Sequence, residues 1–575
     1  MPASTDEVAP DDRRAAPEGR DAQAFPQLTD DQIDRVRPFG EVVELKAGEH
    51  TFERGQRAAD FYVLLDGCIE IFDYDCQGNQ TVFTTHCERQ FTGEIDLFND
   101  RKVLVGGRAG TDSTALKVPR DAFREMVSAE PDIGEVVLRA FIVRRLGILE
   151  SNLGGSWLIG RRGDKETLRI QQFLQRNGYP VRTVYHGEDD HAEEGLKNSG
   201  CTADDLPVLL CHGVEPMCGP SLIEVARGTG LAEVPRSGEP YDVAVVGGGP
   251  GGMAAAVYAA SEGLSVVVLE REAPGGQAGT SSKIENYLGF PTGLSGQELA
   301  GRAQIQAQKF GATLALPMDV HGITGTTNGG QSGPPYTVDL GCCDPVTCRS
   351  LVIASGATYR TLDLPNRERF ENAGIYYAAT ALEGGLCEGE EVVVIGGGNS
   401  AGQAAVFLSQ RAEHVYILVR GDSLADSMSD YLTRRIDASD SITLLCNTEV
   451  VELRGEDSLE SLTWENSRTG EREDKPIRHV FSMIGAVPNT TWLGDAVLTN
   501  ERGFVCTGAE VTAEGRWPRE DRQPGTFETS LPGVYAVGDV RAGSVKRVAS
   551  AVGEGSVCVA DVHRVVAAVR EQAGA

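Results

Sequence analysis

Residues 241–271, YDVAVVGGGPGGMAAAVYAASEGLSVVVLER, decide the fold of the largest part of the chain. An apolar run, a glycine cluster, an alanine-rich stretch and a second apolar run predict strand, turn, helix and strand. Gly247, Gly249 and Gly252 form G-x-G-x-x-G, in which the glycines allow a tight turn, a close pyrophosphate and close helix–strand packing. Glu270 follows at the end of the second strand, where a carboxylate accepts a hydrogen bond from a ribose hydroxyl. The stretch predicts a dinucleotide site in a Rossmann-like α/β domain.

A second glycine motif lies in residues 390–420, EEVVVIGGGNSAGQAAVFLSQRAEHVYILVR. Gly396, Gly398 and Ala401 occupy the three motif positions, again between an apolar strand and a helix. Here the second strand ends in Arg420 rather than in an acid, and a base in this place suits a ribose 2′-phosphate. We therefore expect NADPH here, with NADH as the alternative. Two dinucleotide sites in one chain indicate a flavin and a nicotinamide that exchange hydride.

Three further motifs carry a family resemblance: PGGQAG (274–279), IENYLGFP (284–291) and GVYAVGDV (533–540). With the two glycine motifs they make residues 239–567 resemble the thioredoxin-reductase family of flavoproteins. The resemblance implies FAD and NADPH as cofactors, hydride transfer from NADPH to FAD, and a homodimer. It also implies that the NAD(P)H domain is inserted into the FAD domain and rotates against it between half-reactions.

The resemblance also assigns flavin contacts residue by residue, and no metal site is expected. Val548 is a departure, because the family has an Arg-Gln-Ala segment there. The implied contacts are Gln277 and Asn286 on the isoalloxazine, Val320 near the adenine, Gly538 and Asp539 on the ribityl chain, and Arg547, Val548 and Ala549 closing over the ring.

One family feature is absent from the sequence. Thioredoxin reductases carry Cys-Ala-Thr-Cys before the second glycine motif, and residues 378–381 are Ala-Ala-Thr-Ala. We expect an FAD-dependent NADPH-oxidising enzyme without this redox pair; its catalytic residues and electron acceptor are unknown, the acceptor being a small redox protein or a small molecule. Two alternatives stay open: a thioredoxin-disulfide reductase that uses cysteines elsewhere, and a flavin-based redox or nucleotide sensor. Cys387, six residues further on, is expected to be a buried structural thiol.

Residues 26–150 combine short strands with a helical C-terminal part and resemble the cyclic-nucleotide-binding barrel. The family's phosphate-binding segment begins with Gly-Glu, here at Gly93, and an arginine about ten residues later holds the cyclic phosphate. Leu104 lies near that position, and the closest bases are Arg101 and Arg108. An unpaired phosphate in a closed pocket is costly, so we expect an interaction or regulatory barrel rather than a cyclic-nucleotide site.

Residues 151–236 show the order strand, helix, strand, proline and strand, and this order resembles a thioredoxin or glutaredoxin fold. Pro207 lies at the place of the family's cis-proline. The redox pair would lie in the loop 161–164, Arg-Arg-Gly-Asp, which has no cysteine. We expect a redox-inactive module; a relocated thiol site is the alternative, with three nearby candidates: Cys201, Cys211 and Cys218.

The predicted fold class is a multidomain chain with a barrel, a thioredoxin-like α/β module and two Rossmann-like domains. The predicted domains are a disordered tail (1–25), the barrel (26–150), the thioredoxin- or glutaredoxin-like module (151–236), the FAD domain (237–365 and 481–575) and the NAD(P)H domain (366–480).

The 84 acidic and 53 basic residues give the 575-residue chain a net charge of −31. Such a surface repels phosphate backbones and anionic lipids, so we expect no nucleic-acid and no membrane partner. The 13 cysteines include no Cys-x-x-Cys, and the N-terminus shows no secretory signal, so we expect a reduced, cytoplasmic protein. The acidic excess with few lysines fits a salt-rich cytosol or, alternatively, a GC-rich genome.

Overall fold

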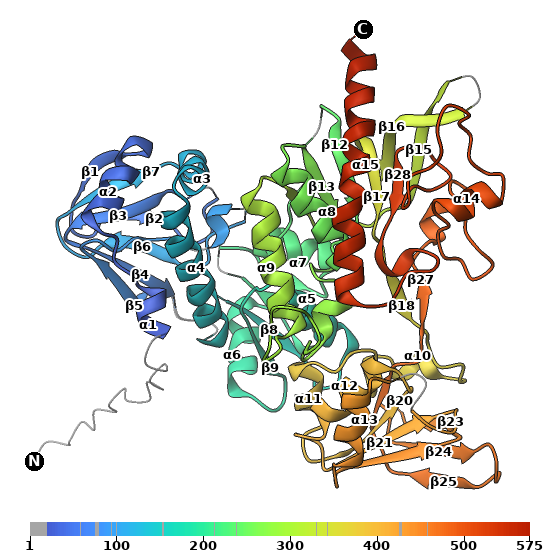
Figure 1. The fold of residues 1–575 in the computed structure, drawn as a ribbon. Coiled ribbons are helices and arrows are strands. Elements are labelled where there is room, and N and C mark those ends of the chain that lie inside the picture. The colour runs from blue at the N-terminus through green and yellow to red at the C-terminus, as the bar shows by residue number, and fades with distance from the viewer. Residues whose placement is uncertain are drawn as a thin grey trace, which may run out of the picture. The chain divides into compact units, whose positions relative to one another are not determined.

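The computed structural model describes residues 20–574 except 58, 75–79, 94, 99–100, 152–154, 212, 237, 329–330, 342, 425–427 and 457. The chain divides into two compact units, Met1–Gly154 and Gly155–Ala575 (Figure 1). None of the helices in the described parts is long and apolar enough to cross a membrane.

The predicted disordered tail, 1–25, is only partly within the described residues, because residues 1–19 lie outside them. The rest of it differs from the prediction: Arg20–Ala24 form helix α1 and Ala24 is buried. The Arg144 guanidinium donates a hydrogen bond to the Ala24 carbonyl over 2.7 Å, which ties this helix to the rest of the first unit.

The first unit is an antiparallel barrel-like pair of sheets followed by two helices. The sheets have the strand orders β1-β7-β3 and β2-β6-β4-β5. Five phenylalanines (61, 91, 98, 123 and 141) pack in its core, with neighbouring ring centroids 4.9–6.5 Å apart. The elements are α2 (Asp30–Val36), β1 (Glu41–Leu45), β2 (His50–Phe52), β3 (Phe61–Asp66), β4 (Cys68–Tyr74), β5 (Gln80–Cys87), β6 (Gly106–Ala109), β7 (Ser113–Val118), α3 (Arg120–Ala129) and α4 (Pro131–Ser151).

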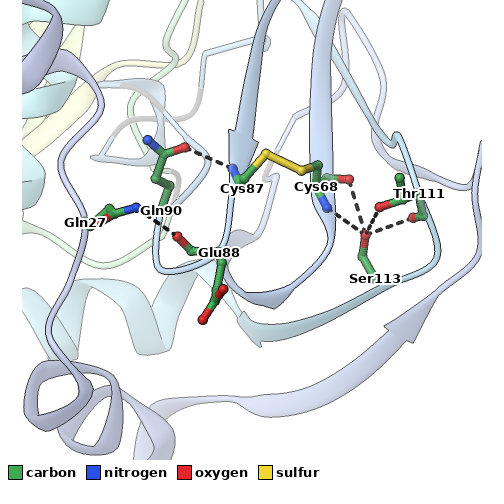
Figure 2. The surroundings of a disulfide bond; sticks show 7 residues. All are labelled: Gln27, Cys68, Cys87, Glu88, Gln90, Thr111 and Ser113. Carbon is green, nitrogen blue, oxygen red and sulfur yellow. Dashed lines mark hydrogen bonds between the residues drawn. A yellow bond between two sulfur atoms is a disulfide. The ribbon is translucent and has the colours of Figure 1, made fainter.

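A disulfide joins Cys68 at the start of β4 to Cys87 at the end of β5 (Figure 2). This corrects the expectation that all cysteines are reduced. The physical reason is the hairpin register, which places the two residues directly opposite each other. The Cys87 N–H donates to the Gln90 side chain over 2.9 Å, and the Cys68 N–H donates to the Ser113 hydroxyl over 3.0 Å.

The second unit begins with a small α/β module that has the strand order β11-β10-β8-β9. Strands β8 and β9 are parallel, and β10 and β11 are antiparallel to their neighbours. The Leu206–Pro207 peptide bond is cis, at the position where the sequence predicts it. The elements are β8 (Ser156–Gly160), α5 (Lys165–Arg176), β9 (Val181–Tyr185), α6 (Asp190–Ser199), β10 (Val208–Leu210), β11 (Met217–Cys218) and α7 (Leu222–Thr229).

The next domain has a sheet of order β14-β13-β12-β17-β16-β15, with β28 beside β17. Strands β12 and β13 are fully buried, and helices α8 and α15 pack together beside this sheet (Figure 1). The elements are β12 (Tyr241–Val246), α8 (Pro250–Ser261), β13 (Val266–Leu269), α9 (Gly296–Lys309), β14 (Thr313–Ala315), β15 (Gly322–Asn328), β16 (Gln331–Asp339), β17 (Val346–Ile353), α14 (Ala509–Ala513), β28 (Val534–Ala536) and α15 (Val548–Gly574).

The inserted domain has a parallel sheet of order β19-β26-β20-β21-β22 and a three-stranded antiparallel sheet, β23-β24-β25. The chain enters and leaves it through the antiparallel pair β18 (Ala357–Tyr359) and β27 (Ala486–Pro488). The border predicted at residue 480 falls inside β26. The other elements are α10 (Arg367–Phe370), β19 (Ile375–Tyr376), α11 (Ala381–Leu386), β20 (Glu391–Ile395), α12 (Asn399–Leu408), β21 (His414–Val419), α13 (Asp430–Asp437), β22 (Ile442–Cys446), β23 (Thr448–Arg454), β24 (Ser461–Asn466), β25 (Arg472–Lys475) and β26 (His479–Ser482).

Candidate functional site

The first glycine turn connects β12 to α8 and packs too closely for larger residues. Gly247 has φ of 105°, and a Cβ built on Gly252 would lie 2.0 Å from the Gly247 carbonyl oxygen. Gly249 is the N-cap of α8 and faces open space, and in the described chain no side chain caps the helix there. Because the first N–H groups of a helix lack partners within it, this uncapped start is suited to a phosphate.

Glu270 follows β13 and is buried beside the same turn. Its carboxylate accepts hydrogen bonds from the N–H groups of Gly248 (2.6 Å), Glu272 (2.8 Å) and Ala273 (3.2 Å). Burial raises the pKa of Glu270, and the Glu272 and Gly248 N–H groups oppose that rise. The fixed carboxylate lines the cavity next to the turn, as a ribose-binding acid would.

A cavity of about 810 Å³ opens at the turn, and the inserted domain and the small α/β module also contribute to its wall. Most of the sequence-predicted flavin contacts lie on this wall. The predicted residues that line it are Gly247, Gly249, Glu270, Gln277, Asn286, Val320, Gly538, Asp539, Arg547, Val548 and Ala549. Gly252 lies behind the wall, packed against the turn.

The part of η6 (Gly538–Val540) and the start of α15 that line the cavity lie close to the start of α8. The 27-residue α15 begins at Val548, so the partial positive charge of its N-terminus is directed at the cavity. The Lys546 ammonium donates a hydrogen bond to the Asp539 carbonyl. Burial raises the pKa of Asp539, and the nearby Lys546 opposes that rise. The N-terminus of α15 and the Lys546 ammonium therefore favour negative charge on a ligand at this end of the cavity, whereas the Asp539 carboxylate opposes it.

The second glycine turn lies between β20 and α12. A Cβ on Gly396 would lie 2.6 Å from the Met483 carbonyl oxygen, and Ala401 is fully buried. Gly398 is the N-cap of α12, and no side-chain cap is present there in the described chain. These motif residues are not part of the cavity wall, although Ser400 on the same helix is.

Arg420 also lies away from this cavity. It follows β21 directly, and its side chain is exposed. The strand β21 runs parallel to β20, so Arg420 lies at the same edge of the sheet as the glycine turn. An exposed guanidinium at this edge is accessible to the 2′-phosphate of a nucleotide bound on the turn.

Sequence reasoning missed the contribution of the small α/β module to the cavity. Gln172, Gln175 and Arg176 of α5 line it. The Arg176 guanidinium forms an ion pair with Glu272 at 2.9 Å and donates to the Gly276 carbonyl over 3.2 Å. No local motif marks these residues, because their role depends on tertiary contacts about 100 positions away.

No cysteine is among the described residues of the cavity wall. Ala378 and Thr380, from the segment where the family carries its cysteines, both line it. Thr380 and Glu383 form a capping box that starts α11. Cys387 at the end of this helix is fully buried, as expected, and burial raises its pKa to about 11. A buried, protonated thiol of this kind is a poor nucleophile.

Comparison with known proteins decides the family. Residues 241–555 match the family model for pyridine nucleotide-disulphide oxidoreductases. The chain belongs to this family. It is 32% identical over 332 residues to thioredoxin reductase from Bacillus subtilis (strain 168), an alignment that covers 58% of this chain and 96% of that protein. It is 33% identical to NADPH-dependent thioredoxin reductase 3 from Arabidopsis thaliana, over 56% of this chain and 58% of the other.

Solved structures agree with this family assignment. A crystal structure of Lactococcus lactis thioredoxin reductase in the FR conformation has 28% identity and a TM-score of 0.50, covering 57% of this chain and 99% of its own. The structure of T. acidophilum thioredoxin reductase has 29% identity and the same score and coverage. The expected resemblance to thioredoxin reductases is thus confirmed. The protein is an FAD-dependent NADPH oxidoreductase, since this family uses FAD and NADPH.

The N-terminal barrel matches the cyclic nucleotide-binding domain over residues 42–130, which confirms its predicted family. The two arginines nearest to the expected phosphate position differ in their surroundings. Arg101 is buried, and Arg108 forms an ion pair with Glu70 at 2.9 Å and donates to Gln80 over 2.6 Å. Leu104 is buried as well. The expectation that this barrel does not bind a cyclic phosphate stays a prediction.

Proposed function

We propose that this protein oxidises NADPH and delivers the electrons from FAD to an acceptor directly, without a dithiol of its own between them. The observation that carries the proposal is the cavity wall, whose described residues include Ala378 and no cysteine. A disulfide is reduced through a thiolate that attacks it and forms a mixed disulfide, and this cavity offers no such group. The acceptor is a small redox protein or small molecule that approaches the cavity.

The residues described on the cavity wall are suited to hold FAD. When bound, FAD accepts hydride from NADPH and passes the electrons on. The uncapped start of α8 would bind the pyrophosphate, and Glu270 would accept a hydrogen bond from the ribose. Asp539 and Gln277 would orient the ribityl chain and the ring. The N-terminus of α15 would stabilise negative charge on the bound group, because its partial positive charge faces the cavity.

An anaerobic titration with NADPH tests this proposal. We expect the flavin absorbance to be lost after one NADPH per FAD, because no cysteine among the described residues lines the flavin cavity to take up a second pair of electrons. A thiol assay before and after the titration serves as the control, and the number of free thiols per protein should be the same in both. Uptake of two NADPH per FAD, together with two new thiols, would show that a coupled dithiol exists and would favour the disulfide-reductase alternative.

The NADPH preference is tested at Arg420. Arg420→Glu is expected to raise the Kd for NADPH more than tenfold, because attraction to the 2′-phosphate becomes repulsion. The Kd for NADH should change much less, since NADH lacks this phosphate. Stopped-flow reduction of the flavin at varied coenzyme concentrations measures both values. The matched control is Arg434→Glu on α13, an arginine that is 78% exposed in the same domain. A wild type that already prefers NADH would refute the assignment.

We further infer a homodimer that resides in the cytoplasm. Two large side chains support the dimer: Tyr258 on α8 is 47% exposed and Val557 on α15 is 62% exposed, although these helices pack on each other. Apolar side chains that stay exposed on paired helices are suited to a subunit interface. The cytoplasmic location rests on the use of NADPH, a coenzyme of the cell interior.

A further inference from the structure

Two thiols of the small α/β module lie next to each other, away from the flavin cavity. The Sγ atoms of Cys201 and Cys218 are 3.4 Å apart, and both cysteines are free. Cys201 follows α6 directly after Gly200, whose left-handed conformation ends the helix. Cys218 ends β11, where the sheet register places it opposite the buried Val208. Two separate elements therefore bring these sulfurs together.

The surroundings of the pair are suited to a disulfide rather than to a metal. Tetrahedral zinc takes four ligands, and the nearby Asp205 is already engaged in a capping box. Its carboxylate accepts hydrogen bonds from the Thr202 N–H over 2.7 Å and from the Thr202 hydroxyl over 2.8 Å. Among the described residues no group of three or more metal-binding side chains occurs. A disulfide needs an S–S distance of about 2.05 Å, and the two sulfurs are 3.4 Å apart in the dithiol form.

The pair is accessible from outside and does not line the flavin cavity. Cys218 is exposed and lies on β11, an edge strand of its sheet. The loop before α5 contacts the segment that joins the two cysteines, because Arg161 donates a hydrogen bond to the Ala203 carbonyl over 2.7 Å. The other end of α5, at Arg176, lines the flavin cavity. The first cavity residue of α5, Gln172, lies seven residues or about 10 Å along the helix from Lys165, and neither Cys201 nor Cys218 lines the cavity.

We propose that Cys201 and Cys218 form a reversible dithiol–disulfide pair that exchanges with disulfides of small thiols or of partner proteins. The Cys218 thiolate attacks one sulfur of the incoming disulfide, a bond forms between them, and the first thiolate leaves. The Cys201 thiolate then attacks the Cys218 sulfur and expels the second thiolate. Two electrons pass from the pair to the incoming disulfide, and the two protons of the pair end on the two released thiols.

The first step is expected to be faster at alkaline pH. Partial desolvation, the hydrogen-bonded Cys201 thiol and the Asp205 carboxylate together raise the pKa of Cys218 to about 11. The thiolate is the attacking species, so its fraction at neutral pH is small and grows as the pH rises. An exchange assay at about pH 9 therefore gives the larger signal.

The test uses the full-length protein with FAD bound and glutathione disulfide as the probe. We expect the wild type to lose two thiols and to yield a peptide cross-linked between Cys201 and Cys218, as seen by mass spectrometry. Cys201→Ser should instead keep glutathione on Cys218, at a level at least tenfold above the wild type. The matched control, Cys211→Ser, replaces a buried cysteine of the same module and should behave as the wild type.

Two results would overturn the proposal: separate glutathione adducts on both cysteines without a cross-link, or no reaction at Cys218. Each variant is also checked for flavin reduction by NADPH, which should be unchanged. Because the exchange assay contains no NADPH, its outcome is independent of the function proposed for the flavin domain. Failure of one therefore does not imply failure of the other.

Discussion

Gly252→Ala is expected to lose most of its FAD. The new methyl group would lie 2.0 Å from the Gly247 carbonyl oxygen, so the glycine turn and α8 would have to move apart. Overpacking of this kind costs about 3 kcal/mol, and that loss corresponds to a roughly 100-fold weaker affinity for a ligand bound on the turn. The ratio of flavin to protein absorbance after gel filtration, with an FAD titration of the apoprotein, measures the effect.

The matched control for this variant is Gly301→Ala on α9, in the same domain. A Cβ there meets no atom within 4 Å, and alanine is favoured over glycine inside a helix by about 0.5–1 kcal/mol. This control should bind FAD as the wild type does and should melt at an equal or higher temperature. If Gly252→Ala retains full FAD content and an unchanged melting temperature, then the turn does not hold the cofactor as described.

The parts of the site that the sequence could predict are those encoded by local motifs. Both glycine turns have the expected strand–turn–helix context, and Glu270 lies beside the first turn because it ends the neighbouring parallel strand. Most of the residues assigned by resemblance line one cavity. These residues lie within short segments whose order along the chain fixes their place in a Rossmann-like sheet.

The features that sequence reasoning missed depend on contacts between distant segments. The Cys68–Cys87 disulfide follows from a hairpin register, and the ion pair between Arg176 and Glu272 follows from the way the small module packs on the flavin domain. Neither residue pair has a spacing that marks it in the sequence. The sequence names Cys201, Cys211 and Cys218 as candidates for a relocated thiol site, but their spacing does not show which two of the three meet.

The protein is expected to reduce thioredoxin with NADPH far more slowly than it reduces an acceptor that is not a disulfide. Ala378 lies on the cavity wall where the family has a redox cysteine, and the remaining candidate thiols are either buried, as in Cys387, or lie on the small module. Without a thiolate at the flavin, no mixed disulfide with thioredoxin can form there. We expect the rate of thioredoxin reduction to be below roughly 1% of the rate with a non-disulfide acceptor. The reason is that the loss of a catalytic group typically lowers a reaction rate by about 10²-fold or more.

The control is a variant with serine in place of Cys201, Cys211, Cys218 and Cys387. It removes the three cysteines of the small module named above and the one nearest to the Ala378 segment. Electron transfer to ferricyanide, which needs no thiol, should continue at the wild-type rate in this variant, provided that its FAD content is unchanged.

Steady-state NADPH oxidation with thioredoxin and with ferricyanide, in the wild type and in the four-serine variant, distinguishes direct electron transfer from FAD from transfer through the protein's own cysteines. We expect turnover with ferricyanide in both proteins, and thioredoxin turnover no higher than the background of free thiols in both. Robust thioredoxin turnover by the wild type that disappears in the four-serine variant would contradict this expectation, because electrons would then leave the protein through its own cysteines.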